Sequence, residues 1–216
     1  MQPLDPAPAI EARRAAEGRV FLLSPARTDG KRAAMLLRPR APSELARRLR
    51  SREGVPLGEV YAFLSSLYFR GKLEYARAFG AAASGEPAAL VITPASGLMR
   101  PEEPVTAKDL RAFARVPVDA REARYRAPLE AATRRLTLSL GPRGEAVLLG
   151  SIATAKYVDV LLPLLGPRLR FPREFVGRGD MSRAGLMLRR AREGRELEYV
   201  AVLGATRTGA RPPRAV

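Results

Sequence analysis

The chain has 216 residues, with 38 Lys and Arg against 22 Asp and Glu, and it contains no His, no Cys and no Trp. The absence of Cys excludes disulfides, thiol nucleophiles and cysteine-ligated zinc or iron–sulfur clusters. The absence of His excludes a Ser-His-Asp triad and imidazole metal ligands. Any catalysis must therefore use carboxylates, amines, guanidinium groups, hydroxyls, backbone groups or a metal held by oxygen ligands.

The formal net charge of +16 favours a polyanionic partner, with nucleic acid first. Residues 1–56 hold 12 basic and 6 acidic side chains, and residues 166–216 hold 12 and 5, so the two segments together carry a net +13. If they lie on one face, they form a continuous positive surface. The alternatives are a merely solubilising surface, a small phosphorylated ligand or an anionic membrane.

Apolar runs of strand length alternate along the chain with segments of helical period. Three runs have no polar face, so we expect adjacent, parallel, buried strands at Val20–Leu23, Leu90–Thr93 and Val147–Leu149. Between the first two, a helix opens at Ser43, and another covers 57–68 until Gly71 breaks it, before a second helix over 73–79.

Helix signals continue in the second half of the chain. Thr106 and Asp109 have the spacing of a capping box, and Pro128 suits the first turn of a helix. A further helix follows the third strand from about residue 154 to 165. Asp180 or Ser182 is expected to cap the last helix, and 197–203 alternates like an edge strand.

This order of elements predicts an α/β fold, a three-layer Rossmann-like sandwich with a mostly parallel sheet. We expect residues 1–18 to be a flexible or partly helical tail, 19–204 a single α/β domain, and 205–216 a basic flexible tail. Because no signal peptide or spanning segment is evident, the cytoplasm is the default location and no membrane partner is expected.

In such sheets the ligand lies at the carboxyl ends of the strands. The loops 24–31, 93–98 and 150–157 follow the three buried strands there and bring Gly, hydroxyl residues and cations. Ordinary turn chemistry is the alternative interpretation of these loops. The candidate phosphate-binding residues from them are Arg27, Lys31, Gly97, Gly150, Ser151 and Lys156.

The third loop resembles a Walker A loop without completing it. Gly150 is followed by four residues and then by Ala155-Lys156-Tyr157, where the motif needs Gly-Lys-Ser or Gly-Lys-Thr. The second Gly and the magnesium-binding hydroxyl are both missing, which argues against a P-loop NTPase. Lys156 still suits a phosphate-facing cation at a helix start.

Residues 177–183 add two glycines before a helix, with Arg178 and Arg183 as further candidate phosphate ligands. Asp180 is either the helix cap or, with Asp29, a candidate acid/base or magnesium-binding carboxylate. No dedicated metal site or cofactor is predicted. The three-fold choice between cap, base and metal ligand stays open at this point.

Aromatic and cationic side chains interleave over residues 68–75, a mixture that suits base stacking and phosphate contact. In the alternative interpretation, Tyr68 and Phe69 are helix ends in the core, and the cations are a solvated junction. The candidate nucleic-acid-binding residues are Tyr68, Arg70 and Lys72, together with Arg47, Arg48 and Arg50 of the short basic helix.

Three stretches carry a resemblance to known proteins: Val20-Phe-Leu-Leu-Ser, Tyr68-Phe-Arg-Gly-Lys-Leu-Glu-Tyr-Ala-Arg and Val91-Ile-Thr-Pro-Ala-Ser-Gly-Leu. Over about half of the chain, the order of elements resembles that of uncharacterised bacterial proteins and of the uracil-DNA-glycosylase-like domain of archaeal tRNA-base-modifying enzymes. The resemblance implies the same fold and a nucleic-acid theme. The glycosylase loop Gly-Gln-Asp-Pro-Tyr is absent and the family's late His is missing, so no catalytic residue is carried over.

The leading hypothesis is a nucleic-acid-binding α/β protein, with a base or nucleotide processed at the carboxyl ends of the strands. The first alternative is an enzyme or sensor for a small phosphorylated metabolite. The second is a basic interaction subunit without an active site. A pocket lined by the three loops would favour the first two functions, and a shallow basic face would favour the third.

Overall fold

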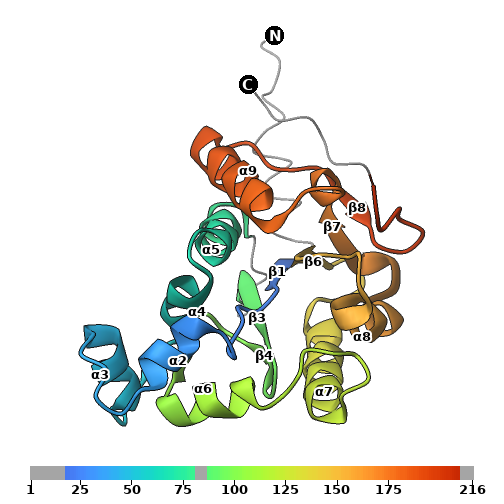
Figure 1. The fold of residues 1–216 in the computed structure, drawn as a ribbon. Helices are drawn as coiled ribbons and strands as arrows, with labels where there is room; N and C mark the ends of the chain where they lie inside the picture. The colour runs from blue at the N-terminus through green and yellow to red at the C-terminus, as the bar shows by residue number, and fades with distance from the viewer. Residues whose placement is uncertain (1–17, 81–86, 210–216) are drawn as a thin grey trace.

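The computed structural model describes residues 18–80 and 87–209 of the protein. Most of the two predicted tails, and the short helix expected within the first of them, lie outside these ranges. Within them, the chain forms a mixed α/β sandwich around a mostly parallel six-stranded sheet (Figure 1). A small antiparallel ladder of β2 (Val55–Pro56) and β5 (Pro104–Val105) lies beside it.

The three predicted strands are adjacent, parallel and buried, which confirms the expectation from their apolar runs. β7 continues the parallel pairing on β6, while β4 and β8 are short antiparallel edges. In spatial order, the strands are β4 (Gly97–Met99), β3 (Ala89–Thr93), β1 (Arg19–Leu23), β6 (Glu145–Leu149), β7 (Leu169–Pro172) and β8 (Tyr199–Ala201).

Helices cover both faces of the sheet because successive strand residues point to opposite sides. Phe21 and Leu23 of β1 join one hydrophobic core, and Val20 and Leu22 join the other. The first core is covered by α2 (Lys31–Leu37), α3 (Glu44–Arg50), α4 (Leu57–Ser65), α5 (Leu67–Phe79), α6 (Ala107–Ala114) and α9 (Asp180–Glu193), and the second by α7 (Ala123–Ser139) and α8 (Ala155–Leu165). Two 3₁₀ turns flank β7, at Gly166–Arg168 and Arg173–Phe175.

The helix break predicted at Gly71 is wrong. α5 runs unbroken through Gly71, and the break from α4 falls earlier, at Ser66, whose φ is 48°. A Cβ atom at Gly71 would lie 3.2 Å from the Ala184 carbonyl oxygen of α9. Gly71 therefore serves the close packing of α5 on α9, which lie side by side in Figure 1.

Local helix signals gave mixed results. The Ser43 cap and the Thr106–Asp109 capping box are confirmed. Pro128 lies inside α7 and not in its first turn, because the helix already begins at Ala123. Asp180 is the first residue of α9 and Gly179 precedes it as the N-cap, so the prediction that Asp180 or Ser182 caps this helix is wrong.

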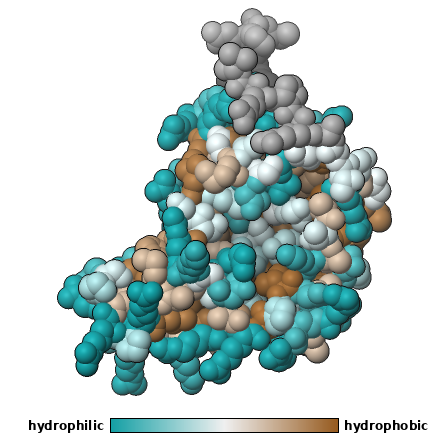
Figure 2. Space-filling model, viewed as in Figure 1, coloured by the Kyte–Doolittle hydropathy of each residue, from teal (hydrophilic) through white to brown (hydrophobic). Residues whose placement is uncertain are grey.

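Hydrophilic side chains cover most of the face seen in Figure 2, and hydrophobic side chains appear in small separate areas. Among the residues described, no helix has both the length and the apolar character needed to cross a membrane.

Candidate functional site

The connections from the two central strands run in opposite directions. From β1 the chain moves towards β3, and from β6 it moves towards β7, so a crevice opens between the carboxyl ends of β1 and β6. Ser24 and Gly150 follow these two strands and meet there, since a Cβ atom at Gly150 would lie 3.0 Å from Ser24 Cβ. The sheet therefore places a ligand-binding position between the first and third predicted loops.

A cleft of about 470 Å³ lies at this position. The loop Pro25–Asp29 after β1 forms one wall, Lys156 and Tyr157 of α8 form another, and residues 113–118 at the end of α6 close it. Two of the three loops expected to hold a ligand are thus brought together. We call this space the switch-point cleft.

The cleft has an excess of positive charge. Arg27 and Asp29 neutralise each other, with Nε 3.1 Å from Oδ1, and this contact lowers the pKa of Asp29. Arg115 and Lys156 are exposed at the cleft, and neither forms an ion pair with any residue in the described ranges. Tyr157 adds aromatic surface beside these two cations, and Phe113 backs the cleft wall.

The second predicted loop does not line the cleft. A Cβ atom at Gly97 would lie 2.4 Å from the Pro128 carbonyl oxygen, so the close approach that this glycine permits is to α7. Thr93 Oγ1 also donates to the Gly97 carbonyl over 3.0 Å and accepts from Ser96 N over 3.1 Å. The side chain of Thr93 therefore bonds within this loop, and the loop packs closely against α7.

The remaining candidates from the first and third loops lie near the crevice without lining the cleft. Ser151 Oγ accepts a hydrogen bond from Ala153 N over 3.3 Å, as in an ordinary turn. Lys31 is the exposed first residue of α2.

The arginines at the start of α9 already bind protein groups. Arg178 Nε donates to the Glu174 carbonyl over 2.9 Å, and Nη1 lies 3.1 Å from Ser182 Oγ. Arg183 is 8% exposed, and its Nε and Nη2 donate to the Phe175 carbonyl over 3.2 and 3.1 Å. These contacts order the turn before α9, and neither guanidinium lines the cleft.

Asp29 and Asp180 do not form a carboxylate pair. Asp29 binds Arg27, and Asp180 lies 3.7 Å from Arg183 Nη1. In the part of the chain that the structure describes, no group of three or more acidic side chains gathers to hold a metal ion. The two carboxylates therefore pair with arginines in different segments of the chain.

The prediction that Lys72 contacts nucleic acid at the protein surface is wrong, because this side chain is completely buried. Its Nζ donates to the Ser24 carbonyl over 2.6 Å and to Ser24 Oγ over 2.9 Å. Burial lowers the pKa of Lys72 to about 7, while Asp180 raises it and Arg183 lowers it further. Lys72 lies on the apolar stripe of Tyr68 and Tyr75, a signal that is visible only when 67–79 is treated as one helix.

Tyr68 is not free to stack on a base. Its side chain is 8% exposed, and Lys72 Nζ lies 4.2 Å from the centre of its ring. Its buried hydroxyl has no hydrogen-bond partner in the structure. Arg70, by contrast, is exposed on α5.

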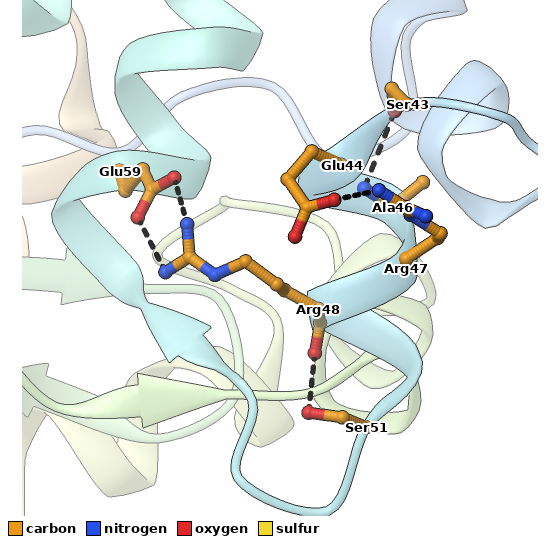
Figure 3. Close-up of polar contacts among 7 residues, drawn as sticks. All are labelled: Ser43, Glu44, Ala46, Arg47, Arg48, Ser51 and Glu59. Carbon is orange, nitrogen blue, oxygen red and sulfur yellow. Dashed lines mark hydrogen bonds and ion pairs between the residues drawn. The ribbon is translucent and has the colours of Figure 1, made fainter.

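The basic helix α3 has less uncompensated charge than its sequence indicates (Figure 3). Arg48 binds Glu59 through two hydrogen bonds of 2.8 and 3.0 Å, and Arg47 pairs with Glu44. Arg50 donates to the Ala41 carbonyl over 3.2 Å. Acidic neighbours therefore neutralise Arg47 and Arg48, two of the three candidate nucleic-acid-binding residues on this helix.

Comparison with protein-family models, curated proteins and solved structures finds no match. The resemblance to the uracil-DNA-glycosylase-like domain therefore stays a prediction, and function must be argued from the geometry of the cleft.

Proposed function

We propose that this protein binds nucleic acid and seats one nucleotide of the bound strand in the switch-point cleft. The observation that carries the proposal is the position of Arg115 and Lys156 in a cleft at the carboxyl ends of the central strands, where neither pairs with an acidic group of residues 18–80 or 87–209. A phosphate group is the natural counter-charge for such a pair.

The other walls of the cleft suit the rest of a nucleotide. Lys156 is the second residue of α8, and the Thr154 side chain does not cap that helix, so first-turn N–H groups are available beside the lysine. Tyr157 is half-buried and offers aromatic surface for a base or sugar, whereas Phe113 is 2% exposed and only backs the cleft wall. The net charge of +16 supplies the long-range attraction to a polyanion.

A small phosphorylated metabolite is the second candidate, because a cleft of about 470 Å³ also suits a ligand of that size. The two functions predict different effects of the length of the nucleic-acid ligand on affinity. A nucleic-acid-binding protein gains affinity from neighbouring phosphates, whereas a metabolite site binds a mononucleotide as well as an oligonucleotide.

The first prediction concerns binding to a labelled 20-nucleotide RNA and to a mixed-sequence DNA duplex, measured by fluorescence anisotropy. On the duplex, five or six phosphate contacts imply a log–log salt slope of roughly −5, so affinity should fall about a thousandfold between 50 and 200 mM salt. On the single-stranded RNA the same contacts imply a slope of roughly −4 and a fall of about 200-fold. Lys156→Ala and Arg115→Ala should each weaken binding and reduce the slope by about 1.

Arg143→Ala is the matched control, since it removes the same charge from an exposed residue in the turn before β6, at the amino-terminal ends of the strands and therefore opposite the cleft. Its affinity should stay close to the wild-type value. Absence of binding at 50 mM salt would reject the nucleic-acid proposal. Equal losses in all three variants would reject the cleft as the binding site, and tight binding of a mononucleotide alone would favour the metabolite.

A further inference from the structure

Ser24 and Lys72 form a hydrogen-bonded pair at the bottom of the crevice, and the proposed binding function does not use it. Ser24 is the first residue after β1, and Lys72 lies on the second turn of α5. Lys72 Nζ lies 2.9 Å from Ser24 Oγ and 2.6 Å from the Ser24 carbonyl oxygen. The carbonyl contact holds the amine against the hydroxyl, within hydrogen-bond reach.

The surroundings of Lys72 favour its neutral form. The amine is completely buried, and loss of hydration favours its neutral form. The rings of Tyr68 and Phe69, 4.2 and 5.1 Å away, favour the cation, and burial outweighs them. Burial lowers the pKa of Lys72 to about 7, and of the charged groups on α9, Asp180 raises it and Arg183 lowers it. In the structure Lys72 Nζ donates to Ser24 Oγ, and the Ser24 hydroxyl donates to the Leu149 carbonyl over 3.2 Å. When the amine is neutral, its lone pair can accept the Ser24 proton once the hydroxyl turns from Leu149 towards Nζ.

The Ser24 hydroxyl adjoins the switch-point cleft. Pro25 and Ala26, the next two residues, line the cleft, as does Tyr157. Burial raises the pKa of Tyr157, and the nearby Ser24 hydroxyl partly offsets that rise, so Ser24 lies close to a side chain that lines the cleft. Ser24 is 4% exposed and is not itself one of the residues that line the cleft, so a substrate reaches its hydroxyl only if a neighbouring side chain moves.

We propose that Ser24 is a nucleophile and Lys72 its general base, in a site that hydrolyses an ester bearing an anionic group. A nucleophile and a base within hydrogen-bond reach, with the base oriented by a third group, form the arrangement that activates a serine. The anionic group is assigned because Arg115 and Lys156 line the same cleft, and this part rests on the proposed function.

The reaction needs no co-reactant besides water. Ser24 Oγ bonds to the acyl carbon while its proton passes to Lys72 Nζ. The ester C–O bond then breaks, and the leaving alcohol takes the proton from Lys72. In the second half, water gives a proton to Lys72 and attacks the acyl carbon, the bond to Ser24 Oγ breaks, and Oγ regains the proton. Ester and water become acid and alcohol.

The alternative is that Lys72 only joins α5 to the end of β1. The Ser24 carbonyl, the Ser24 hydroxyl and the Tyr68 ring already surround its amine. A structural role predicts that removing the amine changes stability, and it predicts no special reactivity at Ser24. Reactivity of the wild-type chain therefore separates the two roles.

The experiment treats the full chain with a fluorophosphonate probe that carries no anionic group and maps the modified residue by mass spectrometry. We expect modification at Ser24, with a rate that rises with pH around the pKa of about 7 of Lys72. Ser24→Ala should abolish the labelling, and Lys72→Met should slow it by about 100-fold or more and remove its pH dependence. Ser139→Ala and Lys108→Met are the matched controls and should label like the wild type.

Melting temperatures of all variants show whether each is folded, and the mapping on the wild type stands even if Lys72→Met does not fold. No modified serine, modification elsewhere, or an unchanged rate in a folded Lys72→Met variant would overturn the proposal. Because the probe has no anionic group, its result is independent of oligonucleotide binding. The failure of one proposal is therefore distinguishable from failure of the other.

Discussion

The free energy of unfolding of the wild type should rise relative to that of Lys72→Met as the pH is raised from 7 to 10. The pKa of Lys72 is about 7 in the folded protein, against 10.5 for an ordinary lysine. Between these two pH values the unfolded chain binds a proton that the folded chain does not, so stability increases with pH, by up to about 1.4 kcal/mol per pH unit. Below pH 7 the difference should level off.

Denaturant titrations of both proteins between pH 6 and pH 10 measure this effect. The groups around Lys72 are Ser24, Tyr68, Asp180 and Arg183, with Tyr157 near Asp180 and Tyr68. Burial raises the pKa of Tyr68 and Tyr157, so both stay protonated in the folded protein over this range. Lys108→Met, at an exposed lysine, should show no such trend, and a pH-independent difference for Lys72→Met would contradict the buried neutral amine.

Gly97→Ala should lower the free energy of unfolding by about 2–4 kcal/mol. Gly97 has φ of +68°, and an added Cβ would lie 2.4 Å from the Pro128 carbonyl oxygen and 3.0 Å from Ala132 Cβ. The methyl group must therefore push β4 away from α7 in addition to straining the backbone. Thermal or urea unfolding measures the loss.

Gly141→Ala separates the two causes. Gly141 has nearly the same φ, +67°, but no atom lies within 4 Å of the position of its Cβ. Only the backbone strain remains there, so we expect a loss of about 1–2 kcal/mol. Equal losses for the two variants would contradict the steric clash expected between an added Cβ at Gly97 and α7.

The central sheet was predictable because burial on both faces leaves a simple sequence pattern. The apolar runs in β1, β3 and β6 contain no solvent-facing position, and strands of that kind occur in parallel sheets. The loops at their carboxyl ends follow from the topology, which is why Arg27, Asp29 and Lys156 were placed near one another correctly. β4 was missed because its three residues pair with β3 through a short turn.

The side-chain chemistry was less predictable, because it depends on contacts between distant segments. Lys72 meets Ser24 across 48 residues, and Arg48 meets Glu59 only after α3 packs beside α4. Among the aromatic and basic residues of 68–75, Lys72 has the sequence pattern of a surface residue. Its buried position becomes evident only when the helix is known to continue through Gly71. Arg115 was not singled out at all, since it ends α6 without a motif of its own.

Photo-crosslinking tests most directly whether the switch-point cleft holds a nucleotide. An RNA substituted with 4-thiouridine is bound to the full chain at 50 mM salt, irradiated, and the crosslinked peptides are identified by mass spectrometry. We expect crosslinks at Tyr157, within 25–29 or within 114–118, and we expect Lys156→Ala to reduce them more than Arg143→Ala does. Crosslinks confined to other surfaces, such as α3, with none in the cleft, would contradict the assignment.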